Sequence, residues 1–108
     1  MSVNSAIVTA LKDIAPTYAN TYTGTATTYI TFYYSTAGVI HADNNPQFDR
    51  YDVTVDYYCP TDFDCVATLD SIKAALRKAG FSWPAVTNVN DTEGQHWAFD
   101  CTYVEALT

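Results

Sequence analysis

The sequence predicts an α+β fold, in which two helices pack against an antiparallel β-sheet of about four strands in a single domain over residues 1–108. Two segments repeat apolar residues at helical spacing, and four segments are rich in β-branched and aromatic residues. Strands that follow one another through a turn or loop form antiparallel sheets, and helices must then cover the apolar face. The predicted order is helix, strand, strand, helix, strand, strand.

The first helix is predicted over residues 3–14, because apolar residues recur there every three or four positions. It should end before Pro16, since the residue before a proline avoids helical geometry. Threonine-rich residues 17–28 predict extended chain or an irregular strand, and residues 29–34 predict a clear strand.

Residues 35–48 are interpreted as a long loop, because they combine Gly38 and Pro46 with little periodicity. Asp43, Asn44 and Asn45 favour turns over sheet, and they are the candidate residues for contact with a partner. A loop of this length is expected to be mobile in the free chain and to order against a neighbouring protein.

The strand over residues 49–59 is the clearest, because apolar and polar residues alternate along it. A second helix follows over residues 62–79, with an acidic first turn and Gly80 as its stop. Its predicted buried stripe runs from Val66 to Ala79. Two strands over residues 85–90 and 96–105 complete the sheet, and the last is predicted to have Trp97, Phe99, Cys101 and Tyr103 on one face.

The acidic composition limits the function classes. Twelve Asp and Glu residues against five Lys and Arg residues give a net charge of −7, which is opposite to the basic footprint of a nucleic-acid clamp. It also disfavours docking on anionic membranes. The sequence contains no phosphate-binding glycine loop, and it predicts neither a cofactor nor a catalytic motif.

The cysteines and histidines do not predict a metal site. Three cysteines without a CxxC pair are interpreted as small buried hydrophobic residues. His96 and Cys101 lie five positions apart on one strand and should therefore project from opposite faces. A Cys/His nucleophilic pair formed by the fold is the alternative.

Asp52, Asp56 and Asp100 are predicted to lie on one sheet face, opposite the apolar residues of their strands. Three interpretations remain open for this candidate acidic sheet face. It is a solvated surface, a surface that repels a polyanion passing close by, or a pair of catalytic carboxylates of the glycosidase type.

The tyrosines also allow two interpretations. Tyr29 and Tyr33 share a face, so either they are exposed as part of a protein interface, or the sheet is buried on both sides.

Several short motifs occur in a recognisable order over nearly the whole chain: Pro16-Thr17-Tyr18, Tyr22-Thr23-Gly24, Tyr29-Ile30-Thr31-Phe32, Ala42-Asp43-Asn44, the strand from Val53 to Tyr58, the helix end from Lys73 to Phe81, Asp91-Thr92-Glu93-Gly94 and Tyr103-Val104-Glu105. Their order and spacing resemble the tail terminator (tail completion) proteins of long-tailed bacteriophages and prophages. The sequence is similar also to other small head–tail joining proteins.

The resemblance implies a structural virion protein that is not an enzyme. Such a protein forms a homo-hexameric ring at the head-proximal end of the tail tube, ends tube polymerisation and joins the tail to the head. Its implied partners are the tail tube protein and a head completion or connector protein, and DNA passes through the ring without specific binding. Assembly would take place in the cytoplasm of the bacterial host. A small acidic hydrolase and a ligand-binding module are the alternatives from other classes.

Overall fold

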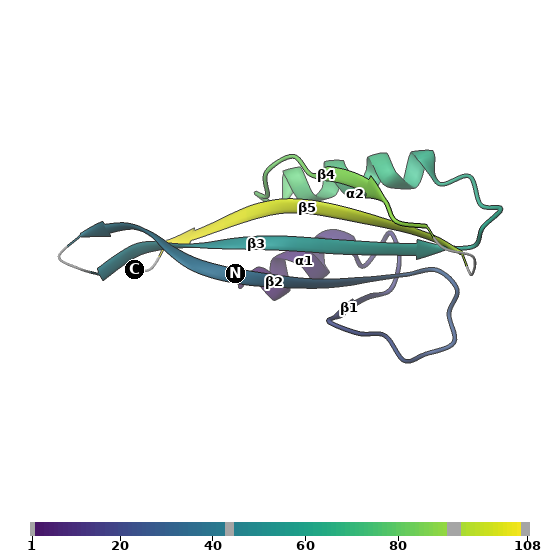
Figure 1. The fold of residues 1–108 in the computed structure, drawn as a ribbon, viewed down its shortest axis with the longest axis horizontal. Coiled ribbons are helices and arrows are strands. Elements are labelled where there is room, and N and C mark those ends of the chain that lie inside the picture. Colours follow the sequence, from purple (N-terminus) through teal and green to yellow (C-terminus); the bar gives the residue numbers. More distant parts are fainter. Residues whose placement is uncertain (1, 43–44, 91–93, 107–108) are drawn as a thin grey trace.

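The computed structural model describes residues 2–42, 45–90 and 94–106, with side chains described outside residues 37–47 and 106 (Figure 1). The elements in chain order are α1 (Val3–Leu11), β1 (Thr17–Ala19), β2 (Tyr29–Ala42), β3 (Asn45–Cys59), α2 (Val66–Lys78), β4 (Ala85–Asn88) and β5 (Gln95–Ala106). The predicted α+β class is confirmed. The order differs from the prediction by one strand: helix, three strands, helix, two strands.

The strands form one five-stranded sheet in the order β1-β2-β3-β5-β4. Three of its pairs are antiparallel, as predicted, but β1 pairs with β2 in parallel, with Thr17 opposite Ile30. The threonine-rich segment contributes only this short strand. The sheet is therefore mixed and mostly antiparallel.

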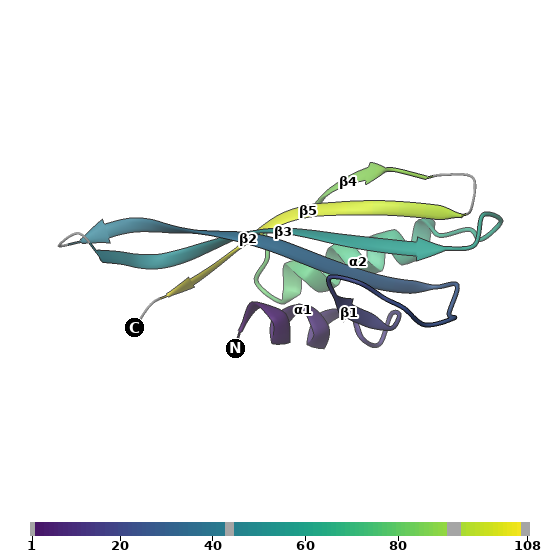
Figure 2. The same ribbon diagram turned by 60° about the horizontal axis from the view of Figure 1, so that its bottom comes forward.

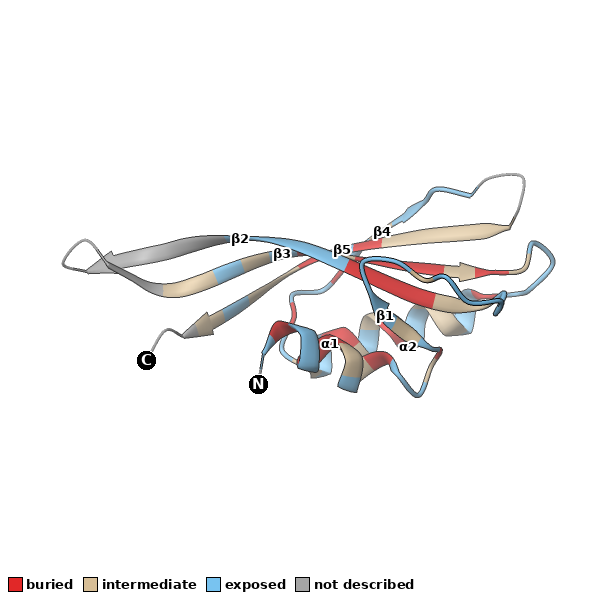
Figure 3. Ribbon diagram, turned by 90° about the horizontal axis from the view of Figure 1, so that it is seen from below, coloured by how far each residue is buried: buried red, intermediate tan, exposed pale blue. Residues whose placement is uncertain are grey.

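Both helices lie on the same face of the sheet (Figures 2 and 3). Residues from both layers form one core, in which the largest fully buried side chains are Tyr57, Phe32, Phe81, Phe99, Ile7, Leu11, Ile30, Ile72, Leu76, Val53 and Val55. In the described part of the chain, neither helix is long and apolar enough to cross a membrane.

The first helix is shorter than predicted. The side chain of Ser2 accepts a hydrogen bond from the Ser5 backbone at its start, and the helix ends at Leu11. Residues 12–14 form turns, in which the carbonyl of Leu11 accepts from both Ile14 and Ala15.

The second helix starts at Val66, four residues later than predicted. The amide of Gln95 donates to the carbonyls of Pro60, Thr61 and Phe63, which holds residues 60–63 in a non-helical path. Val66 is exposed, so its placement on the buried stripe is wrong, whereas Ile72 and Leu76 are buried. Gly80 stops the helix as predicted, with a φ of 100° that favours glycine.

The predicted alternation along β3 is confirmed for most residues. Val53 and Val55 face the core, Tyr51 is half-buried, and Asp52 is exposed on the opposite face. Asp56 lies on the same face as Asp52 but is buried, at 9 % exposure. Of the three interpretations of this face, a fully solvated surface therefore does not describe Asp56, whose Oδ1 lies 2.8 Å from Nε2 of His96.

The long loop predicted over residues 35–48 is wrong. β2 and β3 pair continuously as far as Ala42 opposite Asn45, so only residues 43 and 44 lie between the paired positions. Asn45 is the first residue of β3, whereas Asp43 and Asn44 lie outside the described residues. The predicted mobility of this region is not tested.

The outer part of this hairpin, residues 37–50, extends past both helices and is called the arm below (Figure 1). It makes the molecule elongated, with principal extents of 54 × 25 × 23 Å. Pro46 is tolerated near the tip of the hairpin. A proline has no backbone N–H, so it removes only one hydrogen-bond donor between β2 and β3 there. The arm has no helical layer of its own.

Candidate functional site

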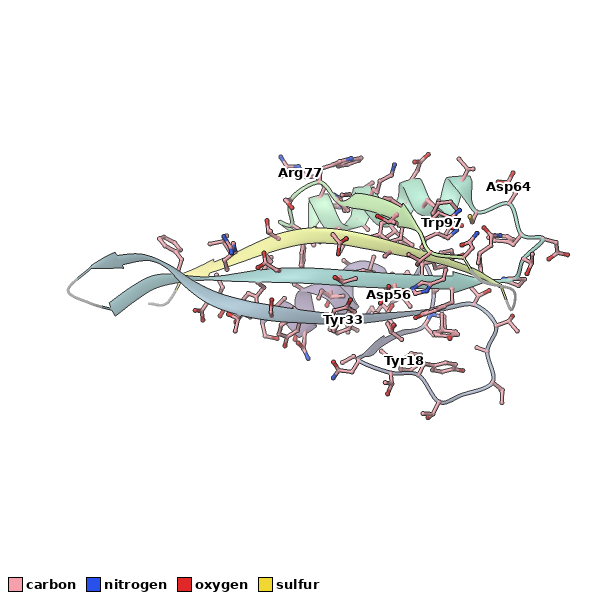
Figure 4. The ribbon with its side chains drawn as sticks, viewed as in Figure 1. Tyr18, Tyr33, Asp56, Asp64, Arg77 and Trp97 are labelled. Carbon is pink, nitrogen blue, oxygen red and sulfur yellow. The ribbon has the colours of Figure 1, made fainter. Side chains whose placement is uncertain are left out.

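The sheet face that carries no helix is the candidate site, and it is called the open face below. Because the β2–β3 and β3–β5 registers are continuous, alternate residues of three strands point to this one side. Their side chains are mainly aromatic, acidic or hydroxyl-bearing: Tyr29, Thr31, Tyr33, Asp52, Thr54, Asp56, Tyr58, His96, Asp100 and Thr102. Figure 4 labels Tyr33 and Asp56 on adjacent strands of this face.

An aspartate–histidine pair lies at the centre of the open face. Nε2 of His96 is 2.8 Å from Oδ1 of Asp56, and both side chains are largely covered. His96 comes from β5 and Asp56 from β3, and the backbone N–H of His96 also donates to the side chain of Asn90 at 2.7 Å. The pair therefore joins two strands and fixes the orientation of the histidine ring.

Aromatic rings continue from this histidine across the sheet. The ring centroids are 4.3 Å apart for His96 and Tyr58, 4.6 Å for Tyr58 and Tyr29, 4.5 Å for Tyr29 and Tyr22, and 4.7 Å for Tyr22 and Tyr18. These five residues are called the aromatic row. Burial raises the pKa of Tyr58, and the charge of Asp56 acts in the same direction. The row attaches the segment between β1 and β2 to the sheet.

Gly24 lies directly against the ring of Tyr22. A Cβ at position 24 would meet the hydroxyl end of that side chain, so a larger residue would require the tyrosine to shift. That same hydroxyl accepts a hydrogen bond from the backbone N–H of Ala26 at 2.8 Å. The chain therefore turns tightly around the ring of Tyr22.

A cleft with a volume of about 540 Å³ borders the end of the aromatic row, between the rings of Tyr29, Tyr58 and His96 and the chain that follows β3. Gln95 forms one wall and fixes the geometry. Its Nε2 donates to the carbonyls of Pro60 at 2.9 Å and Phe63 at 2.7 Å, and its Oε1 accepts from Nε1 of Trp97 at 3.1 Å.

The three candidate aspartates share the open face, but each has a different partner. Asp52 pairs with Arg50 at 3.4 Å, Asp56 pairs with His96, and Asp100 accepts a hydrogen bond from Thr54 at 2.8 Å. Asp52 and Asp100 border a second hollow with a volume of about 450 Å³. Both are exposed, whereas an acid catalyst requires a carboxyl kept protonated by a dry, apolar site.

Among the described contacts the cysteines make no hydrogen bond to His96, although Cys59 lines the same cleft. All three are free and buried, and burial raises the pKa of Cys59 and that of Cys101, the latter to about 12. Because only the thiolate is nucleophilic, raised pKa values make poor nucleophiles. Cys101 faces the core, whereas His96 lies on the open face, as the sequence predicted. Within residues 2–42, 45–90 and 94–106, no group of three potential metal ligands occurs.

Charge is divided between the two layers. Four of the five basic residues belong to the helical side: Lys12 follows α1, and Lys73, Arg77 and Lys78 lie in α2. Among the described side chains, the open face carries the three aspartates and one lysine or arginine, Arg50. The acidic character that the sequence predicted for this face is therefore offset in part by Arg50.

Sequence reasoning missed three features of the site. The partnership of Asp56 with His96 depends on the β3–β5 register, which one sequence does not reveal. The aromatic row depends on how residues 20–28 return to the sheet. The sequence gives no indication of the role of Gln95, because a single glutamine at the start of a strand is not a motif.

A scan against protein-family models finds no match for the chain, and a search among curated proteins finds no relative.

Proposed function

We propose that this chain is a tail terminator of a long-tailed phage or prophage. In this proposal six copies form a ring at the head-proximal end of the tail tube, end its polymerisation and provide the joint to the head. DNA then passes through the ring. The resemblance in motif order and spacing over nearly the whole chain is the basis of this proposal, and the open face is the structural observation that carries it.

The open face supports a role in contact with other macromolecules. It is a broad sheet surface without a helical cover, and it exposes Tyr33 at 52 % and Val104 at 52 % beside polar residues. Tyrosine is enriched in protein interfaces, where one part of its ring packs and its hydroxyl bonds. The arm adds a second element, which neither helix covers and which only the end of β5 joins, at residues 48–50.

Charge supports the passage of DNA. Six copies at −7 each carry a formal charge of −42, and the basic residues lie mostly on the helical side. An acidic inner surface repels the phosphate backbone and so allows DNA to slide without binding. We therefore assign the open face to the channel side of the ring and the helices to its outer side.

Another small head–tail joining protein is the nearest alternative, because it would share the same resemblance. A small acidic hydrolase is less well supported, because the aspartates of the open face are engaged by separate partners. Deletion of the gene from the phage that encodes this chain distinguishes a tail terminator from another joining protein. Loss of a terminator leaves overlong tail tubes that carry no heads, whereas loss of another joining protein leaves tubes of normal length.

Complementation provides the control for that experiment. Expression of the wild-type chain from a plasmid should restore tubes of normal length and joined particles, as seen by electron microscopy. Tubes of normal length that join heads in the deletion strain would overturn the proposal.

A further inference from the structure

The outer edge of β2 is unpaired over most of its length. β1 pairs only with Ile30, Thr31 and Phe32, and within the described residues Tyr33–Val39, His41 and Ala42 pair with β3 alone. The side chains from Tyr33 to Thr36 are exposed. A strand edge of this length is a template for pairing with another strand.

This edge also lacks the usual protection against such pairing. Natural edge strands are short, or carry lysine, proline or a bulge. The other two edge strands follow this rule, because β1 has three residues and β4 has four. Residues 33–42 contain no charged residue and no proline, and their register with β3 has no bulge.

The direction of the free backbone groups follows from two hydrogen bonds. The N–H of Ile30 donates to Pro16, and the carbonyl of Phe32 accepts from Asn20, so the even-numbered residues of β2 point away from β3. Because the pairing with β3 is uninterrupted from Tyr33 to Val39, residues 34, 36 and 38 present their N–H and C=O groups at the open edge.

We propose that two copies of this chain pair through this edge, as an antiparallel β2–β2 contact about a two-fold axis at Thr36. This register places Tyr34 opposite Gly38 and Thr36 opposite its own copy, so that all three outward residues of each copy are paired. The absence of charge along this edge removes the like-charge repulsion that self-pairing otherwise meets.

This dimer is a state of the free chain and does not depend on the proposed tail function. A two-fold contact is closed, so it shields the edge and cannot extend into a filament. In a ring of six head-to-tail copies the edge would have to be released, so the dimer would keep the chain from assembling before it meets a tube.

Sedimentation analysis and amide hydrogen exchange test the proposal on the full chain. We expect a species of twice the 11.9 kDa chain mass that dissociates on dilution. The N–H groups of Tyr34 and Thr36 should exchange slowly in the dimer and rapidly after dilution. A monomer at all concentrations with rapid exchange at these positions would overturn the proposal, as would a dimer in which they exchange rapidly.

A matched pair of variants isolates the edge. Thr36→Pro removes an outward N–H without removing a bond to β3, and Thr36→Ala keeps the N–H at the same exposed position. We expect Thr36→Pro to weaken dimerisation about tenfold or more, because the two-fold axis doubles the loss, and Thr36→Ala to leave it unchanged. Equal dimerisation of both variants would contradict an edge contact. The exchange experiment on the wild-type chain decides the question if Thr36→Pro does not fold.

Discussion

At the scale of single residues, Gln95 shows how one side chain determines the path of a connection. Its amide nitrogen holds the carbonyls of Pro60, Thr61 and Phe63, and its oxygen accepts from Trp97 and Cys65. These bonds hold residues 60–63 in a turn, which the Phe63 N–H closes on the Pro60 carbonyl, and α2 therefore starts only at Val66. No residue pattern around Gln95 indicates this role, because it depends on atoms that lie more than 30 positions away.

We predict that Gln95→Ala lowers the free energy of unfolding by about 2 kcal/mol, because partly buried donors and acceptors lose their partner. Thr87→Ala, at an exposed position in β4, should change it by about 0.5 kcal/mol or less. Urea unfolding followed by tryptophan fluorescence measures both values. Equal stability of the two variants would show that the bonds of Gln95 contribute nothing net.

Burial of Cys101 and Tyr57 predicts a loss of stability in alkali. Burial raises the pKa of each group to about 12, from ordinary values of 9.0 for Cys101 and 10.0 for Tyr57. The unfolded chain therefore releases these protons first, so their contribution to stability is complete below pH 9 and is lost as the pH rises towards 12. Between pH 9 and pH 12, each such proton lowers the free energy of unfolding by about 1.4 kcal/mol per pH unit while it is bound in the folded chain and released from the unfolded chain.

Variants assign this slope to individual groups. Cys101→Ala should reduce the slope of unfolding free energy against pH by the contribution of one proton above pH 9. Val104→Ala, at an exposed position without an ionisable group, should leave the slope unchanged. Chemical unfolding at a series of pH values gives both slopes, and an unchanged slope in Cys101→Ala would contradict the assignment.

At the scale of elements, the sequence predicted what depends on local periodicity and failed where pairing depends on distant residues. The alternation along β3 placed Val53, Val55 and Asp52 on their observed sides. The segment from Ser35 to Ala42 has no alternation and contains Gly38, so it was predicted to be loop, yet β3 provides it with a continuous partner strand. The β3–β5 register brings Asp56 beside His96, which periodicity alone does not indicate.

The arm should be separable from the fold. Replacement of residues 38–49 by Asn-Gly joins Ala37 to Arg50, which are already opposite each other, through a tight hairpin turn. We expect the unfolding free energy to change by about 1 kcal/mol or less, because most of the removed residues belong to a two-stranded hairpin, which is only marginally stable by itself. Circular dichroism and urea unfolding provide the measurement.

The shortened variant also tests what the arm does. It lacks the free β2 edge from Gly38 onwards, so it should be monomeric, and it should fail to restore joined particles in the deletion strain. A folded variant that complements the deletion would show that the arm is only a connector. A variant that does not fold would contradict the structural part of this prediction.

At the scale of the whole molecule, the charge division gives the two layers different roles in a ring. Asp52→Lys combined with Asp100→Lys makes the open face basic, and we expect particles that assemble but release DNA poorly. Asp13→Lys, exposed just after α1, changes charge on the helical side and should leave DNA release unchanged. DNA release triggered in purified particles measures the difference. Equal DNA release in both variants would contradict the assignment of the open face to the channel side of the ring.

The central claim, that this chain ends tail tubes, is tested most directly by negative-stain imaging of purified protein added to tail tube protein during its polymerisation. The claim predicts rings on one end of each tube, and a tube length that shortens as more of the chain is added. Tubes that keep their length and carry no rings at any ratio of the two proteins would contradict it.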